Sequence, residues 1–100
     1  MSFAEKVFKI APSELDKAKS ELLEKDDFKT QGYFLKSAKA LNLKGEDYFL
    51  IVSAPIEFFL KNAENLKPYP EVEGDEGAQI ITAVKDQEKA AEAGFGLVMS

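Results

Sequence analysis

The sequence predicts a small single α/β (α+β) domain in which two pairs of helices separate three strands, in the order β-α-α-β-α-α-β. The chain has 100 residues, of which 45% are hydrophobic, which suits one domain built around one core. Short β-branched and aromatic runs alternate with longer segments in which apolar residues recur at helical spacing. Because strands separated by helical pairs need crossover connections, we expect the sheet to be at least partly parallel.

Three short segments have strand character. Residues 7–10, in a strand that could begin at Phe3, combine β-branched and aromatic side chains with interleaved charges. Residues 48–52 are continuously apolar, which is typical of a central strand that is covered on both faces. Residues 95–99 predict a last strand, which follows a helix stop at Gly94.

Start signals and apolar spacing predict four helices. Ser13 can cap the first helix, which we expect to end near Lys25 before Asp26-Asp27, and Thr30 can cap the second. Pro55 suits the first position of the third helix. The apolar residues of the four helices are Leu15, Ala18, Leu22 and Leu23; Tyr33, Phe34, Ala38 and Leu41; Ile56, Phe59, Leu60, Ala63 and Leu66; and Ile80, Ile81, Val84 and Ala91.

An alternative interpretation applies to residues 79–84, whose Ile-Ile-Thr-Ala-Val run also suits a strand followed by a short helix over 86–93. The sheet would then have four strands and would approach a ferredoxin-like fold. We favour the helix.

Residues 67–77 predict an exposed acidic loop, because they contain two prolines, two glycines and a run of carboxylates. Carboxylates suit Ca²⁺ or Mg²⁺, but the spacing does not fit an EF-hand loop, since Gly74 and Glu76 fall at the wrong positions. We therefore expect a solvated loop and no metal site. The acidic residues of this loop are Glu71, Glu73, Asp75 and Glu76.

The residue types that are missing limit the chemistry. The chain has no Cys, His, Arg or Trp, so it lacks thiolate chemistry, the commonest general base and the bidentate guanidinium. We expect no catalytic residue and no cofactor, and the composition favours a protein that is not an enzyme. A net charge of −5 disfavours binding to nucleic acid and to anionic membranes.

The same composition bears on location and source. No signal peptide is visible, and the most apolar stretch, residues 48–60, is interrupted by Pro55 and Glu57, so we expect a cytoplasmic protein. A high content of Lys and Glu without Cys is typical of a thermophile, and an AT-rich genome explains the same pattern.

Phe58 is the best candidate contact residue, because it lies off the apolar stripe of the third helix and aromatic side chains are enriched at interfaces. The sequence therefore favours a protein–protein interaction or regulatory module, with a partner protein or a homodimer. The alternative is a module that binds a small ligand or a divalent metal at the acidic loop or at the strand-to-helix turns near Pro12 and Pro55.

Overall fold

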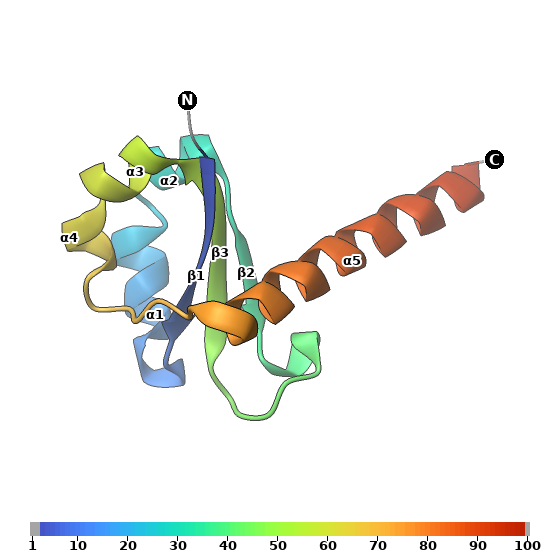
Figure 1. The fold of residues 1–100 in the computed structure, drawn as a ribbon, viewed down its shortest axis with the longest axis horizontal. Coiled ribbons are helices and arrows are strands. Elements are labelled where there is room, and N and C mark those ends of the chain that lie inside the picture. Colours follow the sequence, from blue (N-terminus) through green and yellow to red (C-terminus); the bar gives the residue numbers. More distant parts are fainter. Residues whose placement is uncertain (1–2, 100) are drawn as a thin grey trace.

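The computed structural model describes the backbone of residues 3–99 and the side chains of residues 3–88. A three-stranded sheet separates a group of short helices from one long helix (Figure 1). The prediction of an α+β fold with three strands is confirmed. The strands are β1 (Phe3–Ile10), β2 (Phe34–Ser37) and β3 (Tyr48–Pro55), and the α-helices are α1 (Leu15–Lys17), α2 (Asp26–Gln31), α3 (Ile56–Lys61), α4 (Ala63–Leu66) and α5 (Gly74–Met99).

The sheet has the order β1-β3-β2, and both outer strands are antiparallel to β3. The expectation of parallel neighbours was wrong, because the connection from β2 to β3, residues 38–47, is too short for the crossover that parallel neighbours require. β1 and β2 nevertheless run in the same direction, on either side of the central strand. The segment 48–52 predicted as the central strand is β3, which continues to Pro55.

β2 replaces the helix predicted after Thr30. α2 begins at Asp26, where we expected a break, because carboxylates in the first turn favour the helix dipole. It ends at Gly32, whose φ of 82° an L-residue rarely adopts. The chain leaves the helix there, and its next residues, Tyr33 and Phe34, are aromatic types that suit a strand.

α5 is a single helix over Gly74–Met99, so the stop predicted at Gly94 and the strand predicted at 95–99 were wrong. The Ala-rich sequence before Gly94 favours continued helix. The four-stranded alternative was also wrong, since residues 79–84 are helical. None of the described helices combines the length and apolar character that crossing a bilayer requires.

The predicted acidic loop is shortened at its C-terminal end, because α5 already begins at Gly74. The acidic side chains of this segment are exposed, whereas Tyr69 is buried. Gly77 lies inside α5, where a Cβ would overlap the carbonyl oxygen of Val72, so the close approach of the two segments requires glycine.

The first predicted helix is irregular. It consists of a 3₁₀ turn, η1 (Pro12–Glu14), then α1, then a π-helical turn, η2 (Ala18–Leu22), in which the Leu23 N–H donates to the Ala18 carbonyl at 3.0 Å. The third predicted helix divides into α3 and α4 at Asn62.

The stripe predicted for the third helix is only partly buried. Phe59 and Leu66 lie in the core, whereas Ile56 is 37% and Leu60 72% exposed. The two buried residues lie on different helices, α3 and α4, so the division of the helix ends the regular spacing on which the stripe was based.

The core has two parts, one on each face of the sheet, because alternate residues of a strand point to opposite faces. The short helices cover one face and the first half of α5 covers the other (Figure 1). α5 packs on the sheet through Ile80 and Val84, with an exposed Lys85–Glu5 ion pair of 2.8 Å beside them, and then extends beyond the sheet. The buried residues under the short helices are Phe8, Ile10, Ala18, Leu22, Leu23, Phe28, Leu50, Val52, Ala54, Phe59, Leu66 and Tyr69, and those under α5 are Val7, Ala38, Leu41, Phe49, Ile51, Ile80 and Val84.

Candidate functional sites

The two outer edges of the sheet differ. The edge of β1 is covered by an extended piece of the same chain, where the Lys9 N–H donates to the Pro70 carbonyl at 2.8 Å and the Val72 N–H donates to the Val7 carbonyl at 2.7 Å. No backbone hydrogen bond from another described segment covers the edge of β2 in this way. β2 is therefore the open edge within the described part of the chain.

The register of β2 shows which of its backbone groups face outward. The Ala38 N–H donates to the Asp47 carbonyl at 2.9 Å, which continues the pairing of β2 with β3. In an antiparallel pair the hydrogen-bonded positions alternate, so Phe34 and Lys36 bond to β3. The N–H and C=O groups of Leu35 and Ser37 therefore point away from the sheet.

An aromatic groove begins at this edge. Tyr33 is 36% and Phe34 42% exposed, and they lie where the chain enters β2. The floor is the sheet at Ile51, and the first half of α5 forms a wall. The groove holds about 410 Å³, and its lining is mainly apolar, with one ion pair between Glu5 and Lys85. It is lined by Glu5, Gln31, Gly32, Tyr33, Phe34, Ile51, Ser53, Ile81, Val84 and Lys85.

Phe58, the contact residue predicted from the sequence, is half-buried. Its ring packs edge-on against Phe28, at 5.0 Å between ring centroids, and against Phe59, at 5.4 Å. The exposed apolar residues of the same helix are Ile56 and Leu60. The role of Phe58 as a partner contact stays a prediction.

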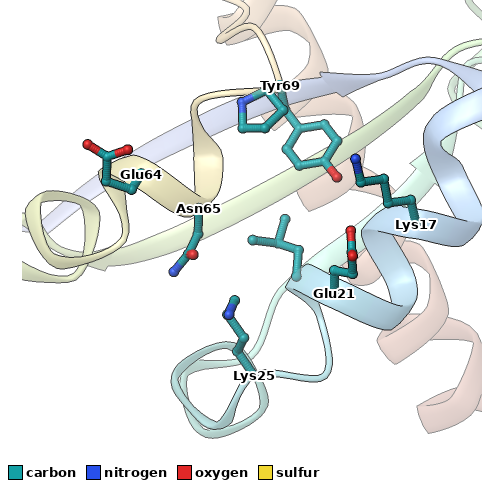
Figure 2. Close-up of a pocket in the computed structure, with 8 residues that line it drawn as sticks. Lys17, Glu21, Lys25, Glu64, Asn65 and Tyr69 are labelled. Carbon is teal, nitrogen blue, oxygen red and sulfur yellow. The ribbon is translucent and has the colours of Figure 1, made fainter.

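A second candidate site is the Tyr69 pocket, a cleft of about 420 Å³ between the π-helical turn and the segment that leaves α4 (Figure 2). Turns with π-helical hydrogen bonding are frequent at functional sites. The floor includes Leu22, which is buried, and the walls carry charged and polar groups. The lining residues are Lys17, Glu21, Leu22, Lys25, Glu64, Asn65, Pro68 and Tyr69.

Tyr69 is 6% exposed, and its hydroxyl points toward the gap between Lys17 and Glu21 (Figure 2). Among the described side chains the hydroxyl has no hydrogen-bond partner. Burial raises the pKa of Tyr69 above its ordinary value of 10.0, and the nearby carboxylates of Glu14 and Glu21 raise it further.

This pKa shift predicts a loss of stability at high pH. Above pH 10.0 the unfolded chain has lost the Tyr69 proton while the folded chain retains it, so the free energy of unfolding falls as the pH rises toward the folded-state pKa. Tyr69→Phe removes this contribution and leaves the lysines unchanged. Urea unfolding of both proteins from about pH 8 to about pH 11 measures the difference.

A direct control is the ultraviolet absorbance of tyrosinate. No tryptophan absorbance overlaps this signal, because the chain has no Trp. The titration of the wild type minus that of Tyr69→Phe isolates Tyr69. A midpoint at or below 10.0 would contradict the environment described here.

Neither candidate site could be recognised from a local motif. Tyr69 lies in the predicted loop and Tyr33 in a predicted helix, and the only sequence signals are an aromatic residue between two prolines and an aromatic pair after Gly32. Among the residues whose side chains are described, no group of three or more His, Cys, Asp or Glu side chains is placed to hold a metal ion.

Comparison with known proteins supplies no relative: no family model, no curated protein and no solved structure matches this chain.

Proposed function

We propose that this chain is a non-enzymatic interaction module that binds an extended segment of a partner protein along β2. The observation that carries the proposal is the pair of outward-facing backbone groups at Leu35 and Ser37, which lie beside the exposed Tyr33 and Phe34. Main-chain bonding to an open edge supplies affinity, and neighbouring side-chain pockets supply specificity.

The chain already pairs in this way with itself at β1, where residues 70–72 cover the other edge through two short backbone hydrogen bonds. On β2 the same type of pairing would place alternate side chains of the partner over the two faces of the sheet. On the α5 face they would meet Phe34 and the aromatic groove, and on the other face Leu35. An extended segment with apolar residues at alternate positions fits both.

Charge favours a foreign partner over a second copy. Two copies would bring together chains of net charge −5, and pairing two β2 strands would place their Lys36 side chains in the same short interface. A foreign segment without net charge meets neither repulsion.

Leu35→Pro tests the edge directly. Proline removes one outward N–H, which an edge strand tolerates without loss of the β2–β3 pairing. The probe is a set of extended peptides selected from a displayed library of random linear peptides against the wild type. We expect Leu35→Pro to weaken their binding at least about tenfold, the loss of roughly one hydrogen bond and its neighbouring contacts. Nuclear magnetic resonance titration of the labelled chain measures the affinity.

The matched control is Leu35→Ala, which shortens the same side chain but keeps the N–H and is expected to retain most of the affinity. Bound peptide should also slow hydrogen exchange at the amides of Leu35 and Ser37. Equal binding to the wild type and to Leu35→Pro would refute the proposal. Protection of these amides that rises with protein concentration alone would assign the edge to a second copy instead. Phe58→Ala in the same titration tests the contact predicted from the sequence.

A further inference from the structure

The Tyr69 pocket carries charges of both signs that are not used within the fold. Its four charged side chains form no ion pair with each other or with any other residue among those whose side chains are described. Lys17 lies in α1, Glu21 in the π-helical turn η2 and Lys25 in the bend before α2, so the three charges reach the pocket from three local conformations. In this structure they remain available to a ligand.

The charges differ between the two ends of the pocket (Figure 2). At one end the Tyr69 hydroxyl lies beside Glu21 and Lys17, and Glu14 adds a second carboxylate close enough to act on the hydroxyl. This end is net negative. At the other end Lys25 lies beside Asn65. Leu22 also lines the pocket.

The second end suits an anion. Asn65 donates one amide hydrogen to Asn62 at 3.0 Å and has a second to offer. Lys25 is exposed and has no described ion-pair partner. Glu64 also lines the pocket and is exposed, as Lys25 is, so water and salt screen both charges, and the Asn65 amide adds an uncharged donor.

We propose that the Tyr69 pocket binds a small zwitterion, a molecule with an ammonium group at one end and a carboxylate at the other. The ammonium would lie between the Tyr69 hydroxyl oxygen, which accepts a hydrogen bond, and the Glu21 carboxylate. The carboxylate would accept hydrogen bonds from Lys25 and Asn65. Leu22, a buried residue of the lining, would contact the carbon atoms between them.

A short peptide and an ω-amino acid both have an ammonium at one end and a carboxylate at the other. The test therefore uses one probe from each class. Alanyl-alanine and 5-aminopentanoate each carry an ammonium and a carboxylate. A peptide bond joins the two halves of alanyl-alanine, whereas 5-aminopentanoate has only a carbon chain between its charged groups. N-acetyl-alanyl-alanine lacks the ammonium, and alanyl-alanine amide lacks the carboxylate. We expect at least one zwitterion to bind with a Kd of about 1 mM or below in calorimetry and in nuclear magnetic resonance titration of the Tyr69 ring. Either blocked peptide should bind at least about tenfold more weakly than the dipeptide if the dipeptide binds.

Variants locate the site. Tyr69→Phe, Glu21→Gln and Lys25→Gln should each weaken the zwitterion about tenfold, the loss expected for one hydrogen bond to a charged group. The matched controls are Lys19→Gln and Glu57→Gln. Both residues are exposed, lie outside the pocket and have no ion pair with a described side chain, so these variants should bind like the wild type.

Three results would overturn the proposal: no saturable binding of either zwitterion, blocked peptides that bind as well as alanyl-alanine, or equal losses in the pocket variants and the controls. Binding of the dipeptide alone assigns the pocket to peptide termini, and binding of 5-aminopentanoate alone assigns it to free amino acids. The inference is independent of the proposed function, because the pocket lies among the short helices, whereas the probes of the first proposal act at β2.

Discussion

Replacement of Phe28 by alanine is expected to lower the free energy of unfolding by about 3–5 kcal/mol. Phe28 is fully buried in α2, and its ring meets that of Phe58 in α3 edge-to-face, at 5.0 Å and an interplanar angle of 71°. The substitution removes apolar area from the centre of the core under the short helices and leaves a cavity between two helices. The surrounding elements are short, but they are joined to the sheet and cannot collapse fully into the space.

Urea unfolding measures the change, and thermal unfolding should show a fall in Tm of more than about 12 °C for a chain of this size. The matched control is Phe34→Ala, since Phe34 is 42% exposed at the sheet edge and its loss should cost less than about 1 kcal/mol. Similar losses in the two variants would show that α2 does not pack on the core as described.

Phe28 also shows how far the sequence predicts this fold. The strands at residues 3–10 and 48–55 follow from composition, because a continuous apolar run and an alternating one each suit a specific place in a sheet. Nothing local marks Phe28 as the centre of a core. It follows Asp26-Asp27, which resembles a helix break but forms the first turn of α2, and Gly32 then ends the helix after a short run.

The short strand β2 illustrates a second limit. Its apolar residues and those of the following turn also fit helical spacing, since four residues of an edge strand hold too little alternation to decide the period. Strand direction then depends on the length of the connection to β3, which is known only once β2 is recognised. An error in one element therefore changed the predicted topology of the whole sheet.

The candidate sites could not be predicted, because each brings together segments that are distant in the sequence. The Tyr69 pocket joins residues 17–25 to residues 64–69, and the aromatic groove joins β1, β3 and α5 to the entry of β2. The residue types at these sites are ordinary for a surface helix or a loop. Their availability to a ligand depends on which charges are left without a partner after folding, and that is a property of tertiary structure.

The attachment of α5 yields the second large effect, since Ile80→Ala is expected to lower the free energy of unfolding by about 2–4 kcal/mol. Ile80 is 1% exposed and packs with Val84 in the cluster that also contains Val7 and Ile51 of the sheet. One helical turn separates Ile80 from Val84, so the two side chains form the apolar face by which the helix contacts the strands. The Lys85–Glu5 ion pair beside them is exposed and contributes little by comparison.

The matched control is Ile56→Ala, because Ile56 is 37% exposed on α3 and should lose less than about 1 kcal/mol. Unfolding is followed by circular dichroism, which reports mainly helix, and by tyrosine fluorescence, to which α5 contributes no residue. If α5 and the sheet form one cooperative unit, both signals shift together in Ile80→Ala. A loss of helical signal at an unchanged tyrosine transition would mean that α5 folds apart from the sheet. The wall of the aromatic groove would then be separable from its floor, and unfolding of α5 should weaken binding along β2 by removing the groove while the outward backbone groups of β2 remain.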